Sequence, residues 1–211
     1  MRIRKCTFCL LLLASCSSLA LAGPNEDYEA GVKAFDKGSM VDAMIPLRLA
    51  ADQGHAAAQA LLAYILDGAE LNEEAAAYYR KSADQGNADG QFGLASLYAT
   101  GEGIAQNLDE ARRLATLAAE QGNKNAIVML AQSHISGGLG LDEAARSGPE
   151  ALAWIKRAAD IDYLPALVTL STAYATGKYG LAIDTKMVES LDARMHKVQG
   201  KMNADNKPQK K

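Results

Sequence analysis

The chain has little cysteine, and all of it lies at one end. Only three of the 211 residues are cysteine, namely Cys6, Cys9 and Cys16. The chain after residue 22 therefore contains no disulfide, although the leader described below would carry it into an oxidising compartment. The stability of that part must come from packing.

Residue groups that perform catalysis are also scarce. The three histidines are His55, His134 and His196, and no two of them have the spacing of metal ligands. No G-x-S-x-G turn is present, and Gly101-Glu-Gly103 follows no strand, so it is not a phosphate-binding loop. We therefore expect a protein that is not an enzyme and that has no metal ion and no cofactor.

Strand patterns and strong net charge are missing too. No stretch alternates apolar and polar residues over the length of a strand, so no sheet is expected. The formal net charge is −3, which argues against a nucleic-acid partner because phosphate binding needs a basic face. Prolines number only five, and Pro46 falls within an expected helix, where proline is tolerated only near the first turn.

The chain contains a repeated segment instead. Residues 52–54 and 84–86 read Asp-Gln-Gly, residues 120–122 read Glu-Gln-Gly, and residues 160–162 close a fourth copy as Asp-Ile-Asp. The spacings between these closings are 32, 36 and 40 residues. Periods of this length are typical of stacked helix pairs, each of which buries its apolar face against its neighbours.

A second pattern recurs inside the copies: a small residue, then an aromatic ring, then a glycine, each three residues after the last. We expect these positions to be structural, and they are Ala95, Tyr98 and Gly101, then Ala131, His134 and Gly137, then Ser171, Tyr174 and Gly177. Small residues let two helices approach closely, and glycine allows a left-handed residue after the last helical turn. Because His134 replaces a tyrosine, we interpret it as a core residue and not as a base or ligand.

The best copy carries a family resemblance. Its loop reads Tyr98-Ala-Thr-Gly101-Glu-Gly103, and an acidic residue and an alanine follow at Asp109 and Ala111. This pattern resembles the Sel1-like repeat family, which is related to tetratricopeptide repeats. The resemblance extends over roughly residues 28 to 180. It implies an all-α fold, a right-handed solenoid of antiparallel helix pairs, although the copy after residue 54 has shed most of the loop.

The predicted organisation has four parts. Residues 1–22 form an export signal, and residues 23–182 form the helical array, with about four repeats of which the first is degenerate. Residues 183–200 form a C-terminal capping helix, because apolar residues fall on one of its faces. Residues 201–211 form a basic, disordered tail.

Two cleavage sites compete in the leader. A short apolar run ends in Leu-Ala-Ser before Cys16, which resembles a bacterial lipobox and makes Cys16 a candidate for lipidation, with a signal of residues 1–15. An ordinary A-x-A site ends at Ala22, giving a signal of residues 1–22. The first site predicts a periplasmic protein anchored to the outer membrane by its lipid alone, and the second a soluble periplasmic or secreted protein.

Two classes of function remain. The first is a monomeric protein–protein interaction scaffold of the cell envelope, which binds a segment of an envelope protein on the concave face of the array. The alternative is a cell-wall-associated or antibiotic-directed hydrolase, for which no nucleophile or acid pair was found. We expect the concave face to present polar residues of the first helix of each pair, namely Gln59, Gln91, Ser96, Gln132 and Thr172.

Overall fold

A computed structural model describes residues 23–205, and these residues form helices with no strand among them. The predicted export signal and the candidate lipidation residue Cys16 lie outside the described residues. The α-helices are α1 (Pro24–Asp36), α2 (Met40–Asp52), α3 (Ala56–Gly68), α4 (Asn72–Asp84), α5 (Ala88–Thr100), α6 (Leu108–Glu120), α7 (Lys124–Gln132), α8 (Glu143–Ser147), α9 (Pro149–Asp160), α10 (Leu164–Thr176) and α11 (Thr185–Asp205). The expected all-α fold is confirmed.

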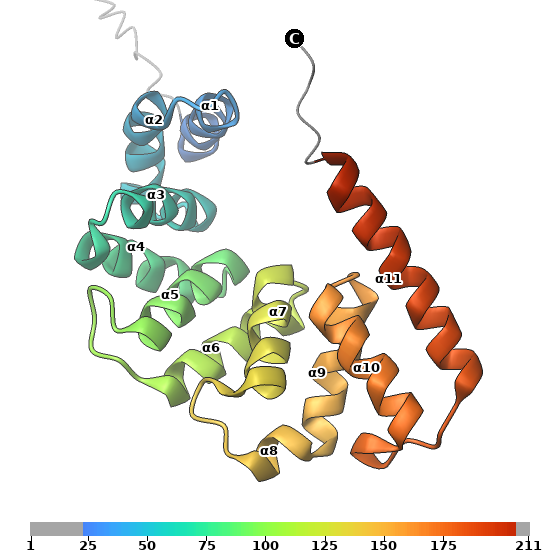
Figure 1. Cartoon of the computed structure of the whole chain (residues 1–211). Helices are drawn as coiled ribbons and strands as arrows, with labels where there is room; N and C mark the ends of the chain where they lie inside the picture. The colour runs from blue at the N-terminus through green and yellow to red at the C-terminus, as the bar shows by residue number, and fades with distance from the viewer. Residues whose placement is uncertain (1–22, 206–211) are drawn as a thin grey trace, which may run out of the picture.

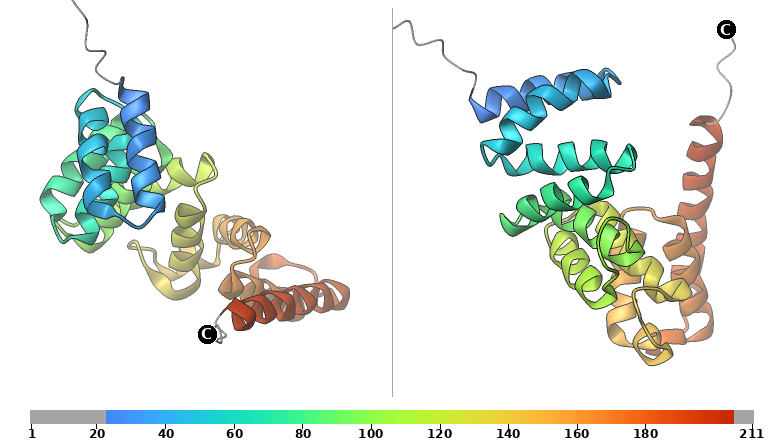
Figure 2. Two further views of the ribbon diagram at one scale, coloured as in Figure 1. Left: turned by 90° about the horizontal axis from the view of Figure 1, so that it is seen from above. Right: turned by 90° about the vertical axis from the view of Figure 1, so that its left-hand side faces the viewer.

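The helices pair in sequence order and the pairs stack into an arc (Figures 1 and 2). The units are α1–α2, α3–α4, α5–α6, α7–α9 and α10–α11, and α8 lies in the connection between α7 and α9. The first helices of neighbouring units touch one another, as α1 touches α3 and α3 touches α5. The first helices therefore line the inner, concave side of the arc.

The end of each second helix explains the Asp-Gln-Gly closing. Gly54, Gly86 and Gly122 have φ values of 89°, 79° and 88°, and Asp162 takes the same left-handed conformation with φ 61°. A left-handed residue reverses the chain after the last helical turn, and asparagine and aspartate tolerate this conformation better than other residues with a side chain. The fourth copy thus keeps the geometry without the glycine.

Small residues form the contact between the two helices of a unit. Ala95 and Ala131 are fully buried, and Ser171 is nearly so. The first unit uses Gly31 at the matching place, where an added Cβ would lie 2.5 Å from Cγ of Leu47. These residues let the backbones approach, so a larger side chain would force the helices apart.

Two boundaries differ from expectation. Helix α2 continues through Pro46, its seventh residue, although proline removes a backbone hydrogen bond there. Burial of Ala43 before it and Leu47 after it holds both halves of the helix on the core. Helix α11 runs from Thr185 to Asp205, so residues 201–205 of the predicted tail are helical.

Within residues 23–205, no helix is both long and apolar enough to cross a membrane.

Candidate functional site

Three of the first helices, α3, α5 and α10, carry almost no charge, whereas the first helix α1 carries five charged residues. Helix α3 carries one charged residue, Asp67, helix α5 carries one, Asp89, and helix α10 carries none. The second helix α6 is different, because it contains five charged residues, namely Asp109, Glu110, Arg112, Arg113 and Glu120. Charge therefore differs between the first and second helices of the α5–α6 unit.

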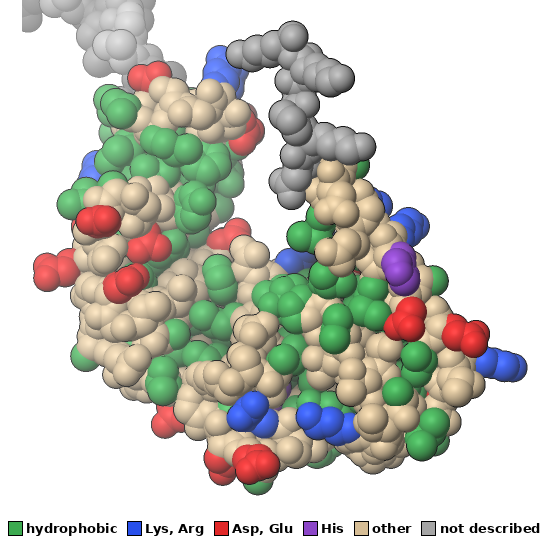
Figure 3. All heavy atoms as spheres, in the orientation of Figure 1, with side chains coloured by type: hydrophobic (Ala, Val, Ile, Leu, Met, Phe, Trp, Pro, Cys, Tyr) green, Lys and Arg blue, Asp and Glu red, His purple; other side chains and the backbone are tan. Residues whose placement is uncertain are grey.

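Aromatic residues gather on the concave side near the N-terminal end. Tyr28, Leu61, Tyr64 and Phe92 surround a depression of about 240 Å³, with Tyr79 also in its lining. We call these five residues the concave shelf. The depression is completed by Ala57, Ala60, Asp89, Gly93 and Asn125. In the space-filling view, hydrophobic side chains gather on the limb that bears α2 and α3, beside the hollow of the arc (Figure 3).

Tyr79 reaches the shelf because Gly93 has no side chain. An added Cβ at Gly93 would lie 2.1 Å from Cε1 of Tyr79, far inside contact distance. The Tyr79 side chain is buried, and burial, followed by the nearby Asp67, raises the pKa of its hydroxyl above the usual range.

Ring contacts hold the other aromatic side chains in place. Tyr28 stacks on His55 with 4.4 Å between ring centroids, and Tyr64 meets the edge of Phe35 at 6.0 Å. His55 is itself fixed, because its Nδ1 accepts a hydrogen bond from the backbone N–H of Ala58 at the start of α3. A surface ordered in this way loses little conformational entropy on binding.

Two of the expected concave contacts, Gln59 and Gln91, are buried. Gln59 and Gln91 are 3% and 6% exposed. Gln85 Nε2 donates to Gln59 Oε1 at 2.7 Å, and Gln121 Nε2 donates to Gln91 Oε1 at 2.8 Å. Both glutamines therefore tie the first helix of a unit to the closing turn of the same unit.

Comparison of equivalent positions in successive repeats indicates that these glutamines are buried. One copy later, the position of Gln91 is held by Ile127, and the position of Gln121 by Ile161. Ile127 is buried, and Ile161 packs against the core. The glutamine pair of one unit is therefore replaced by an isoleucine pair in the next unit. A position that is occupied by either residue type faces the interior.

The three remaining expected contacts share one register position. Ser96 and Gln132 are partly buried and Thr172 is exposed. Gln132 is already engaged, because its Oε1 accepts a hydrogen bond from the hydroxyl of Tyr163 at 2.5 Å. The same register position in α3 is Tyr64, which is 59% exposed and which residue-type reasoning missed.

The predicted structural positions lie where the register places them. Gly101 and Gly177 end α5 and α10 in the left-handed conformation, and Gly137 has φ 83°. Tyr98 and Tyr174 are half-buried against the core. The buried His134 lies in a short π-helical turn, Ser133–Gly137.

His134 is a core residue with one unsatisfied atom. Its Nδ1 is buried and has no hydrogen-bond partner, and burial lowers the pKa of the imidazole. Among residues 23–205 no group of three potential metal ligands comes together.

Comparison with known families decides what kind of repeat this is. The model of the Sel1 repeat matches residues 56–87, 88–123 and 125–163, which together make up just over half of the chain. The protein belongs to the Sel1 repeat family. The three matched segments correspond to α3–α4, α5–α6 and α7–α9, so the first and last helix pairs extend the Sel1 repeats at both ends.

Solved structures of Sel1 repeat proteins have the same architecture. A Sel1 repeat protein from Oxalobacter formigenes is 27% identical, with a TM-score of 0.69 over 82% of this chain and 68% of that one. A protective antigen of uropathogenic Escherichia coli strains is 25% identical, with a TM-score of 0.64 over 83% of this chain but only 38% of its own. A Sel1 repeat protein from Klebsiella pneumoniae, 17% identical, shares the fold with a TM-score of 0.58 over 87% of this chain and 93% of that one.

No curated protein matches the chain. Sel1 repeat proteins are generally non-catalytic helical scaffolds for protein interactions.

Proposed function

We propose that this Sel1 repeat protein is a non-enzymatic scaffold of the bacterial cell envelope, which binds a segment of a partner protein on the concave face. The observation that supports the proposal is the concave shelf, where aromatic side chains gather next to the helices α3 and α5, each of which carries a single charged residue. Aromatic side chains dominate the binding energy of protein interfaces, because they bury much area with few rotatable bonds.

The envelope location rests on the leader. A charged start, a short apolar run and a cleavage site direct export, and Cys16 would carry the lipid. Replacing Cys16 with serine and fractionating cells grown with labelled fatty acid tests the anchor: loss of label and release from membranes support it. A soluble protein that begins at Gly23 would contradict it and would favour the ordinary cleavage site.

Site-specific photo-crosslinking in the native host tests the binding face. A photoreactive phenylalanine analogue is placed at Phe92, which lines the concave shelf only, or at Ala77, an exposed residue of the second helix α4. We expect a discrete crosslinked protein from position 92 and none from position 77. The same product from both positions, or from position 77 alone, would contradict binding on the concave face.

A further inference from the structure

The loop between the two helices of a unit covers the start of the preceding second helix. In the α5–α6 connection, an added Cβ at Gly103 would lie 2.4 Å from the carbonyl carbon of Asn72. Asn72 is the first residue of α4. The loop therefore lies directly on the N-terminal end of α4.

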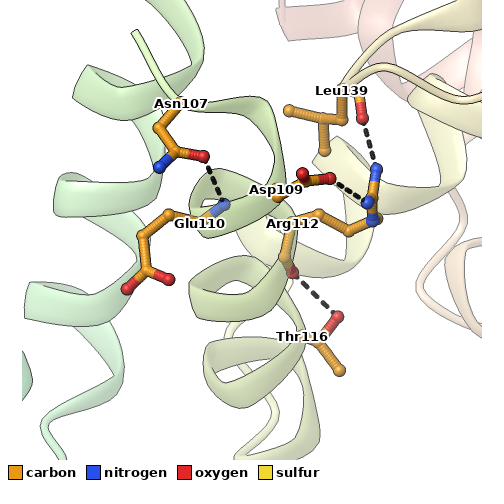
Figure 4. Close-up of polar contacts among 6 residues, drawn as sticks. All are labelled: Asn107, Asp109, Glu110, Arg112, Thr116 and Leu139. Atoms are coloured by element: carbon orange, nitrogen blue, oxygen red, sulfur yellow. Dashed lines mark hydrogen bonds and ion pairs between the residues drawn. The ribbon is translucent and has the colours of Figure 1, made fainter. Parts of the chain in front are cut away.

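The next loop repeats this contact one unit later (Figure 4). Arg112 of α6 donates from Nη1 to the carbonyl oxygen of Leu139 at 2.6 Å, and Leu139 is buried. An added Cβ at Gly140 would lie 3.6 Å from the side chain of Leu108, the first residue of α6. Covering the start of the preceding second helix is thus a regular feature of the array.

In the described part of the chain, no such loop covers the start of α2, the second helix of the first unit. Only residues 69–71 connect α3 to α4, whereas residues 101–107 connect α5 to α6. The residue that corresponds to Asn72 lies 32 positions earlier, at Met40, the first residue of α2. Met40 is 43% exposed and its neighbour Val41 is 76% exposed, so two apolar side chains remain uncovered.

A groove occupies the place of the missing loop. Its volume is about 920 Å³, and its apolar lining consists of Met40, Val41, Met44, Tyr64 and Ile65. We call it the α2–α3 groove. Neighbouring exposed apolar side chains that are bordered by polar residues are typical of protein interaction sites.

The rim of the α2–α3 groove is acidic. Asp67, Glu70 and Glu102 line it, and neither lysine nor arginine does so among the residues the structure describes. Burial, followed by repulsion from Glu102, raises the pKa of the Asp67 carboxyl, as expected where negative charges lack basic partners. A basic ligand would relieve this repulsion.

We propose that the α2–α3 groove binds a segment of a partner protein that takes the place of the missing loop. The segment seats an apolar side chain against Met40 and Val41 and sets lysine or arginine residues beside the acidic rim. This surface is separate from the concave shelf, except that Tyr64 borders both. The protein would then hold partner segments at two places.

Selection from a displayed library of random peptides, using the purified chain from residue 23 onward as bait, tests the proposal. We expect enriched peptides to combine an apolar residue with flanking lysine or arginine. A synthetic enriched peptide should bind roughly tenfold or more weakly to Val41→Lys, and more weakly as salt is raised, because the rim attraction is screened.

Two further variants locate the binding. Leu49→Lys makes the same change two turns further along α2, at a residue that is 53% exposed and outside the groove, and should bind as the original chain does. Replacing residues 69–71 by the sequence of residues 101–107 should cover the groove and abolish binding. Thermal melts establish that all variants are folded.

Three results would overturn the proposal: no enrichment above background, enriched peptides without basic residues, or undiminished binding to Val41→Lys. Binding that is lost in Phe92→Ala and kept in Val41→Lys would assign the peptides to the concave shelf. In that case the groove proposal fails while the proposed concave-face function stands.

Discussion

Adding one methyl group at either of two helical glycines should change stability in opposite directions. Alanine is normally favoured over glycine inside a helix by about 0.5–1 kcal/mol, because glycine loses more backbone entropy on folding. At Gly200 in α11 an added Cβ would meet no atom within 4 Å, so Gly200→Ala should stabilise the protein by that amount. At Gly93 the same atom would lie 2.1 Å from the buried ring of Tyr79.

The clash at Gly93 should exceed the helix preference. Overpacking a well-filled site costs about 1–3 kcal/mol, so Gly93→Ala should be destabilising by a net value of about 1–2 kcal/mol. For a chain of this size, each kcal/mol corresponds to a shift of about 2–4 °C in melting temperature. Thermal unfolding followed by circular dichroism compares both variants with the original chain. A melting temperature that rises for Gly93→Ala as it does for Gly200→Ala would refute the close approach of Tyr79 to α5.

Three other perturbations test the packing of the array. Ala131→Leu should lower the free energy of unfolding by about 1–3 kcal/mol, measured by denaturant titration, because the site is fully buried; an unchanged midpoint would place it on the surface. Burial lowers the pKa of His134, so the unfolded chain binds its proton more readily, and stability should fall as pH drops below the unfolded value of about 6.5. His134→Phe should weaken this loss between pH 7.5 and pH 5, and equal losses in both proteins would contradict it. Gln59→Ile should destabilise the chain, because it removes the buried hydrogen bond from Gln59 Nε2 to the carbonyl oxygen of Ala51 together with the bond from Gln85; an unchanged denaturant midpoint would show that these bonds do not stabilise the array.

The architecture could be predicted because its signals are local and repeated. The closing residues 52–54, 84–86 and 120–122 mark the ends of α2, α4 and α6, where the left-handed conformation is a property of one residue. Asp162 shows that the backbone geometry persists when the glycine is lost. Periodic small residues such as Ala95 and Ala131 also allowed us to predict which helix faces pack against each other.

The binding surface was harder to predict, because residue type is a poor guide to side-chain direction. Gln59 and Gln91 are polar, and only the folded array shows that each meets a second glutamine from the closing turn. Tyr64 occupies the same repeat position as Ser96 and Thr172. It was not among the expected contacts because those were chosen as polar residues. Comparing all copies column by column would have corrected both interpretations.

The α2–α3 groove depends on contacts between units, which no single copy contains. The short connection after α3 is visible in the sequence, but its consequence for Met40 follows only once Gly103 and Leu139 are seen to cover the preceding second helices. The continuation of α2 through Pro46 is likewise a tertiary effect, since packing on both sides outweighs a local cost.

The affinity of the crosslinked partner segment for variants of the two faces tests binding on the concave shelf most directly. Truncating an aromatic residue at the centre of an interface costs about 2 kcal/mol or more, so Phe92→Ala should raise the Kd by roughly tenfold or more in a calorimetric titration. Ile45→Ala, at a residue of α2 that is 70% exposed and outside the shelf, should leave the Kd unchanged. An unchanged Kd for a folded Phe92→Ala protein, or an equal loss in both variants, would contradict the concave shelf as the binding site.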